Sequence, residues 1–188
     1  MAGRLQAVLR VLYLVFNEGY AATAGTFLMR VDLADDAIRL ARALHAGLPD
    51  DAEVSGLLAL MLLVHARHRA RSRADGSLIL MAEQDRGLWD TRLITEGVDI
   101  LQTALAGDRL GEFQAQAAIA ALHADAQTAE ETDWVQIVEW YDELVRLTGS
   151  PVARLNRAVA VGEARGPRAG LAALAGLEIG RASCRERV

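Results

Sequence analysis

Apolar side chains recur every three to four residues along most of the chain, the spacing of one face of an α-helix. Over residues 3–17 this spacing predicts a first helix with one apolar face. We expect a second helix to begin near Asp32, whose carboxylate is suited to capping it. Gly47 and Pro49 predict the end of that helix, because neither residue favours its continuation.

The third expected helix covers about residues 51–71. Asp50 followed by Glu53 matches a capping box, in which two side chains satisfy free N–H groups at a helix start. Every residue from Leu57 to Val64 is apolar. Because a helix that is apolar on all sides is normally buried, we expect this segment to be the most buried part of the protein.

The helical pattern is interrupted over residues 67–80. The Asp-Gly pair at 75–76 is typical of a tight turn, so we expect at most one short hairpin here. A fourth helix is expected to begin near Asp85, to carry Trp89 on its apolar stripe and to end at Gly107.

Capping residues, glycines and prolines divide the rest of the chain into four further expected helices. An alanine-rich stretch predicts the fifth over residues 111–126. Asp133 is suited to capping the sixth, Gly149 to ending it, and Pro151 to the first turn of the seventh. The eighth covers residues 167–177. We therefore predict an all-α fold, an irregular α-solenoid or helical bundle of seven to eight helices with tetratricopeptide-like helix pairs.

The apolar stripes of these helices also predict the large side chains of the core. A residue on the stripe faces the neighbouring helices, whereas a residue off the stripe faces solvent. The expected core residues are Leu57, Leu58, Met61, Leu62, Trp89, Trp134, Ile137 and Tyr141.

Composition narrows the class of protein. The chain has 188 residues, of which 52% are hydrophobic and 24% charged, as in a globular domain. All 20 basic residues are arginine, which with the alanine and glycine content indicates a GC-rich bacterial gene. The net charge of −5 argues against strong binding to nucleic-acid phosphates. No apolar run approaches the ~20 residues that cross a bilayer, and no signal peptide is evident, so we predict a cytoplasmic protein.

The last segment, residues 178–188, differs from the rest. Its sequence EIGRASCRERV resembles the translation of a sequencing adapter and has no apolar periodicity. It also contains Cys184, the single cysteine of the chain. We therefore interpret residues 1–177 as a helical domain, a fragment that continued natively past Leu177, and residues 178–188 as a non-native tail.

Seven short strings carry a resemblance to a known family. In order, they are VLYLVFNEGY (11–20), AIRLARAL (37–44), GLLALMLLVHARHRAR (56–71), EQDRGLWD (83–90), QAAIAALHA (116–124), TDWVQIVEWYDEL (132–144) and SPVARLNRAVAV (150–161). Together they resemble the tetratricopeptide-like C-terminal extension of extracytoplasmic-function (ECF) RNA polymerase sigma factors of the sigma-24-like group. The resemblance covers residues 4–176.

This resemblance implies a regulatory or protein-interaction domain that acts in transcription initiation. The implied partners are the sigma-factor core regions in cis, RNA polymerase, or both. The promoter-reading sigma regions should precede residue 11 and are not present, so we expect no direct DNA binding by this chain. The alternative is a free-standing helical-repeat protein that binds a peptide or a small ligand.

Two polar clusters and one pair are candidates for an interaction surface, because they are least in keeping with simple helix packing. Each also has a structural interpretation, in which the acids cap helices and the aromatic residues fill the core. The candidates are Asn17, Glu18, Tyr20, Gln84, Asp85, Arg86, Asp90, Asn156 and Arg157.

His65 and His68 lie in an arginine-rich segment that also suggests chemistry. Two histidines without further ligands do not make a metal site, and we expect a solvated helix end whose arginines pair with nearby aspartates. The sequence contains no nucleophile elbow, phosphate-binding loop or dinucleotide-binding glycine pattern. We therefore expect no catalytic residues, no metal, no cofactor and no enzymatic activity.

Overall fold

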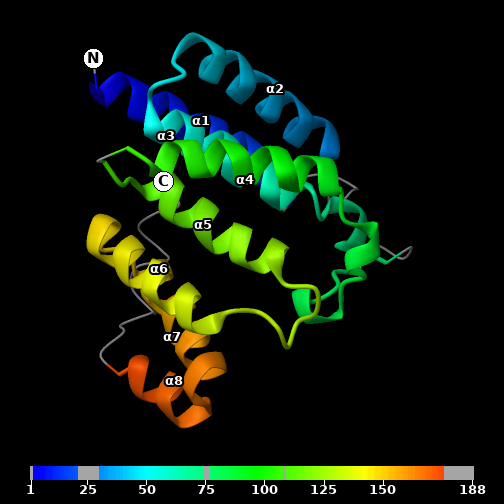
Figure 1. Ribbon diagram of the computed structural model, residues 1–188, viewed down its shortest axis with the longest axis vertical. Coiled ribbons are helices and arrows are strands. Elements are labelled where there is room, and N and C mark those ends of the chain that lie inside the picture. Colours follow the sequence, from blue (N-terminus) through cyan, green and yellow to red (C-terminus); the bar gives the residue numbers. More distant parts are fainter. Residues whose placement is uncertain (1, 21–29, 74–76, 108, 176–188) are drawn as a thin grey trace. The chain divides into compact units, whose positions relative to one another are not determined.

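The computed structural model describes residues 2–20, 30–73, 77–107 and 109–175. This part of the chain contains eight α-helices, three short 3-10 helices and no β-strand (Figure 1). The predicted all-α fold is therefore confirmed. The chain divides into two compact units, residues 1–131 and 132–188, which are described separately below. None of the described helices is both long enough and apolar enough to cross a membrane.

The first unit is built around one central helix. α3 contacts all four of the other α-helices of this unit. Every residue from Val54 to Leu63 is buried, which confirms that the apolar segment of α3 is the centre of the core. The helices are α1 (Ala2–Glu18), α2 (Val31–Gly47), α3 (Ala52–His65), α4 (Thr91–Leu105) and α5 (Glu112–Asp125).

Glycines let two helices approach α3 closely. A Cβ atom placed on Gly56 of α3 would lie 2.7 Å from the backbone nitrogen of Gln114 on α5. A Cβ atom placed on Gly97 of α4 would lie 2.9 Å from Cγ of Leu63. Because atoms cannot approach so closely without a shift, these two glycines set the distances of α5 and α4 from the central helix.

The start of α3 differs from the predicted capping box. Asp51, not Asp50, is the N-cap, and its carboxylate accepts hydrogen bonds from the backbone N–H groups of Glu53 and Val54, both at 3.1 Å. The Glu53 carboxylate instead accepts a bond from the Phe113 N–H at 3.0 Å. Glu53 therefore caps α5, whose N-cap residue is a glycine without a side chain.

The N-terminus of α2 also differs from the prediction. Its N-cap residue is Arg30, which makes no side-chain capping bond. Asp32 lies inside the first turn and pairs with Arg30 at 2.7 Å. The Asp32 carboxylate therefore stabilises the helix start through its charge rather than as a cap.

The connection from α3 to α4 was predicted least well. α3 ends at His65 rather than near residue 71, and a 3-10 helix follows over His68–Ala70. A single antiparallel bridge joins Ser72 to Leu78, in agreement with at most one short hairpin. The predicted turn lies among residues 74–76, outside the described residues. A further 3-10 helix spans Met81–Glu83.

α4 begins at Thr91, not near Asp85. Asp85 caps the 3-10 helix Arg86–Leu88, and Asp90 caps α4 itself. The two aspartates interrupt what appeared in the sequence as one continuous stripe. Trp89 therefore belongs to the connection and not to α4, although it is buried as expected.

The second unit follows its predicted boundaries closely. Its helices are α6 (Trp134–Thr148), α7 (Pro151–Arg165) and α8 (Pro167–Ala173). Asp133 caps α6, and Gly149 ends it with a φ of +63°, a conformation that favours glycine. The eighth helix is shorter than predicted, because α8 ends at Ala173 and not at residue 177. The proposed tail at 178–188 lies outside the described residues.

The core prediction is mostly correct. The five expected core residues from α3 and the connection are buried, and so is Ile137 of α6. The prediction is wrong for Trp134 and Tyr141, because both residues are half-buried.

Candidate functional site

The C-terminal end of α3 brings together the two polar clusters that the sequence singled out. Tyr20 comes from the end of α1, and Arg86 and Trp89 come from the connection before α4. The end of α3 and the turn after it supply the other members. We call this set the arginine–aromatic cluster and define it as Tyr20, His65, Arg67, Arg71, Arg86 and Trp89.

One half of the cluster is a chain of hydrogen bonds that runs from the buried Tyr20 and His65 to an exposed aspartate. The Tyr20 hydroxyl lies 2.6 Å from Nδ1 of His65, and Nε2 of His65 lies 3.1 Å from a carboxylate oxygen of Asp35. Because a carboxylate can only accept, Nε2 carries the hydrogen, and in the neutral ring Nδ1 accepts from the tyrosine. His65 is only 7% exposed, so the expectation of a solvated helix end is wrong for this residue.

Burial sets the protonation of these groups. Burial lowers the pKa of His65, the neighbouring His68 lowers it further, and Asp35 opposes both effects. The His68 ring stacks on the His65 ring with centroids 4.6 Å apart. Burial also raises the pKa of Tyr20 well above its ordinary value, which keeps the phenol protonated at neutral pH.

The other half of the cluster consists of arginines on aromatic faces. The Arg71 guanidinium lies 4.7 Å from the centroid of the Tyr20 ring. The guanidiniums of Arg67 and Arg86 lie 5.8 and 4.5 Å, respectively, from the centroid of the Trp89 ring. Such cation–π contacts hold each planar guanidinium in place while its N–H edges remain free to donate.

The three arginines differ in their hydrogen bonds. Arg86 donates from one nitrogen to the carbonyl oxygens of His123 and Ala126, both at 2.7 Å, and so closes the C-terminal end of α5. In the described part of the chain, Arg67 and Arg71 form no ion pair. Among the described residues of this segment, the pairs are His65–Asp35 and Arg73–Glu83, so the expected network of arginine–aspartate pairs is not found there.

Two buried polar atoms near the cluster have no hydrogen-bond partner among the described residues: Nε1 of Trp89 and Oε1 of Gln84. The other amide atom of Gln84 donates to the Ile79 carbonyl at 3.2 Å. Trp89 is only 6% exposed, so its indole N–H is shielded from solvent. The unpaired Arg67 lies over the ring of this unsatisfied buried donor, so the cluster is rich in hydrogen-bond donors.

Among the remaining candidates, the structural role that the sequence left open is seen for two aspartates. Asp85 and Asp90 cap helices, and Asn17 is exposed at the end of α1 beside the half-buried Glu18. On α7 of the second unit, Arg157 pairs with Asp142 of α6, and its neighbour at position 156 is exposed. The candidates Asn156 and Arg157 thus belong to a different unit from the cluster.

Two residues that border this cluster, Asp35 and His123, were not among the sequence-based candidates. Asp35 was overlooked because nothing in a helical pattern marks which exposed acid meets a histidine from another helix. His123 lies beside Arg67 and Arg86, and burial followed by these two charges lowers its pKa to about 4. The described residues contain no group of three His, Cys, Asp or Glu side chains that could hold a metal ion.

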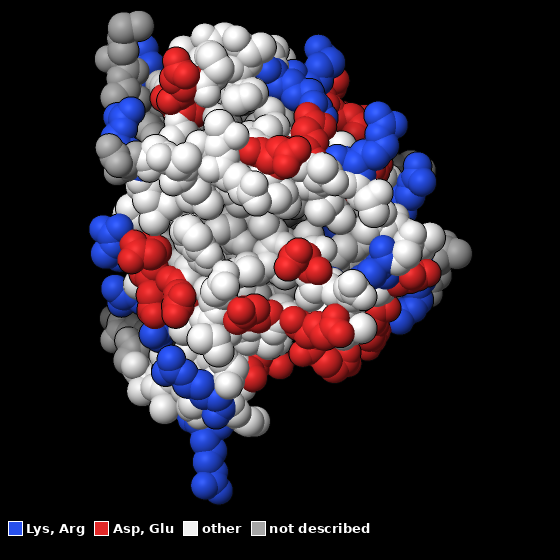
Figure 2. All heavy atoms as spheres, viewed as in Figure 1, with Lys and Arg blue, Asp and Glu red and all other residues white. Residues whose placement is uncertain are grey.

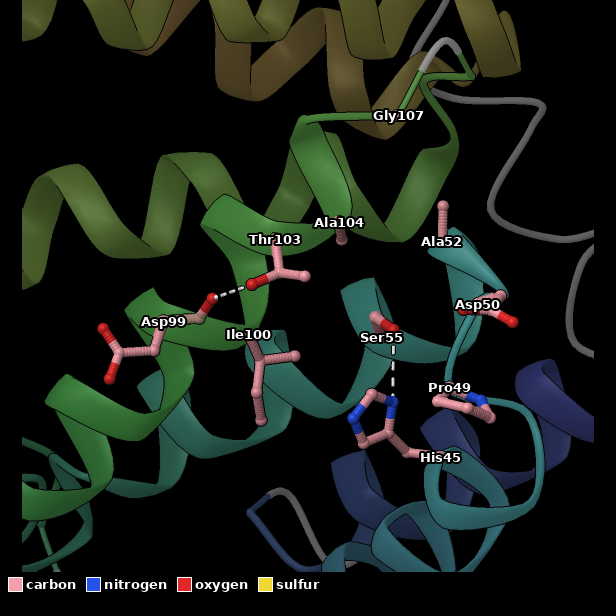
Figure 3. Close-up of a pocket in the computed structure, with 10 residues that line it drawn as sticks. All are labelled: His45, Pro49, Asp50, Ala52, Ser55, Asp99, Ile100, Thr103, Ala104 and Gly107. Atoms are coloured by element: carbon pink, nitrogen blue, oxygen red, sulfur yellow. Dashed lines mark hydrogen bonds between the residues drawn. The ribbon is translucent and has the colours of Figure 1, made fainter.

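A second feature of the first unit is a shallow groove of about 390 Å³ between the α2–α3 turn and α4 (Figure 3). His45 and Ser55 meet there, with Nδ1 and Oγ 3.2 Å apart. The Ser55 hydroxyl also lies 3.1 Å from the Asp51 carbonyl, to which it donates its hydrogen. A bond to the carbonyl four residues earlier is common for a serine inside a helix, so the pair has a structural interpretation.

Comparison with known proteins adds a family to this description. The family of unknown function DUF6596 matches residues 4–105, more than half of the chain. An uncharacterized protein of Rhizobium meliloti (strain 1021) is 50% identical over 171 residues, which are 91% of this chain and 40% of the relative. The chain thus spans about two fifths of the length of that relative. No solved structure matches this chain significantly. Since the family match runs from the first turn of α1 to the last residue of α4, the chain belongs to the DUF6596 family.

Proposed function

We propose that this domain is the regulatory, protein-interaction domain of an ECF-type RNA polymerase sigma factor. It acts in transcription initiation by docking on the sigma core regions of the same polypeptide, on RNA polymerase, or on both. The seven strings quoted above support this proposal. The Rhizobium meliloti relative supports it as well, because the shared region is only 40% of a longer protein and so works beside other parts.

The observation that carries the proposal is the outer face of α1. Val8, Val11 and Leu14 are 46%, 57% and 66% exposed, although the opposite face of the same helix is buried in the core. A surface helix normally presents polar residues to solvent, and an apolar outer face marks a surface that another element covers. By the resemblance, the sigma regions come immediately before this helix, so they are the occupant that we propose.

The charge distribution supports a protein partner rather than DNA. The chain carries a net charge of −5. On the face shown in Figure 2, basic side chains are scattered among acidic and uncharged ones, so no continuous basic patch is available to a phosphate backbone. In this proposal the domain has no enzymatic activity and exerts its effect by binding alone.

A calorimetric titration tests the proposal. The domain is titrated with the part of the Rhizobium meliloti relative that lies outside the shared region. A parallel gel shift at physiological salt uses promoter DNA and random DNA. We expect saturable binding to the polypeptide and equal, weak binding to both DNAs. Sequence-specific DNA binding by the isolated domain would overturn the proposal, and absence of any polypeptide binding would favour a free-standing repeat protein.

A further inference from the structure

We propose that Arg67, Arg71 and the indole N–H of Trp89 form a binding site for the phosphate or carboxylate group of a small molecule. This site is independent of the sigma-factor connection, because it rests only on groups inside the first unit. Three features of the structure support this site: two unpaired arginines, an unpaired buried N–H donor and the aromatic rings that hold the arginines in place.

Arg67 and Arg71 are the cations of the proposed site. Arg67 is half-buried, lies near Arg71 and Arg86, and forms no ion pair in the described part of the chain. The nearby Asp35 carboxylate is engaged by His65, and Arg86 is engaged by two carbonyl oxygens. Like charges that are gathered away from water are unfavourable unless an anion compensates them. Arg67 and Arg71 are therefore the two guanidiniums that remain available.

The indole of Trp89 is the second, independent observation. Its Nε1 atom is buried and has no hydrogen-bond partner among the described residues. A buried indole N–H usually finds an acceptor, and leaving it unpaired costs free energy. Because an indole can only donate, the missing partner must be an acceptor, as an oxyanion is.

The aromatic rings explain why an oxyanion fits. Arg71 lies over Tyr20 and Arg67 lies over Trp89, so both guanidiniums are held by the ring faces. Their planar N–H edges match the paired oxygens of a carboxylate or phosphate. Burial, with Arg71 and Arg86 as further causes, lowers the pKa of Arg67 to about 10, an effect that a bound anion would reverse. The burial of the Trp89 N–H favours a small molecule over a folded partner, because only a small group could reach this donor.

The test compares anions at constant ionic strength. The full chain is titrated with sodium phosphate and with sodium citrate, using sodium chloride as the reference, and the thermal midpoint and calorimetric affinity are measured. We expect phosphate or citrate near saturation to raise the midpoint of the wild type by about 3 °C. Arg67→Gln and Arg71→Gln should each weaken the affinity about tenfold or more.

Two further variants make the result decisive. Arg69→Gln is the matched control, because Arg69 is an exposed arginine between the two site residues, and it should bind as the wild type does. Trp89→Phe keeps both arginines and an aromatic ring but removes the indole N–H, so it should weaken binding several-fold even if Arg67→Gln fails to fold. Equal midpoints in phosphate, citrate and chloride would overturn the proposal. Unchanged anion affinity in Arg71→Gln and Trp89→Phe would also overturn it. A third contradicting result would be that these variants lose polypeptide binding while the wild type binds no anion.

Discussion

The Tyr20 hydroxyl donates a 2.6 Å hydrogen bond to Nδ1 of His65 and so joins the end of α1 to the end of α3. The bond is buried, and the two residues are 45 positions apart in the chain. It is the point at which the helix that we propose as a docking surface is fixed to the central helix of its unit. Its loss should therefore affect both the stability and the position of α1.

Replacing Tyr20 by phenylalanine tests this bond. The variant keeps the ring against Arg71 and Phe16 but leaves Nδ1 of His65 without its donor. We expect a loss of about 1–2 kcal/mol in the free energy of unfolding, measured by urea denaturation. Tyr13→Phe is the control, because the bond from the Tyr13 hydroxyl to Gln116 is only part-buried and its loss should cost less. An equal cost in both variants would contradict the account.

The pH dependence of stability follows from two histidines. The pKa values of His65 and His123 are both lowered in the folded state, that of His123 to about 4. The unfolded chain therefore binds more protons as the pH falls below about 6.5, and the folded state loses stability from there down to about pH 4. His123→Gln should flatten this decline in urea midpoints measured between pH 7 and pH 4. A variant that follows the wild-type curve would show that His123 does not carry the effect.

The cap that Glu53 provides to α5 predicts an effect on a helix far away in the sequence. Glu53→Ala removes the acceptor of the Phe113 N–H and should cost about 1 kcal/mol or more, with faster amide hydrogen exchange at residues 112–114. Asp51→Ala is the comparison, since it removes the true cap of α3 and should speed exchange at residues 53–54 instead. Faster exchange at the start of α3 in Glu53→Ala would support the capping box that the structure contradicts.

The close approach of α3 and α5 gives a packing prediction. Gly56→Ala places a methyl group 2.7 Å from the backbone of Gln114, which cannot move aside as a side-chain tip could. We expect destabilisation of about 1–3 kcal/mol by overpacking. Gly47→Ala is the matched control, because a Cβ atom there meets nothing within 4 Å and the change should be neutral or slightly stabilising. Thermal midpoints of the two variants decide the matter, and similar midpoints would contradict the tight contact.

Much of the fold was predictable because its signals are local. Caps and stops at Asp133, Gly149 and Pro151 are read from neighbouring residues, and all three lie where the sequence places them. The apolar segment of α3 was equally clear. The errors arose where a side chain serves a distant segment: Glu53 fits a local capping box, but its carboxylate caps α5.

The candidate site could be predicted only in part. Tyr20 and Arg86 stood out as polar or aromatic residues in unusual places, and the structure brings both to the end of α3. Their partners could not be inferred, because the Tyr20–His65–Asp35 chain depends on how three helices cross. The burial of Trp89 followed from its type, whereas its unpaired N–H is a property of the packed structure alone.

The central claim is that the outer face of α1 docks the sigma core regions, and one titration tests it most directly. The affinity of the domain for the remainder of the Rhizobium meliloti relative is measured by calorimetry for the wild type and for the double variant Val11→Glu/Leu14→Glu. The control is Val159→Glu, an equally exposed valine on α7 of the second unit. We predict that the double variant binds at least about tenfold more weakly, because two apolar contacts are lost, while the control binds as the wild type does. Equal affinity of the double variant and the wild type would contradict the account.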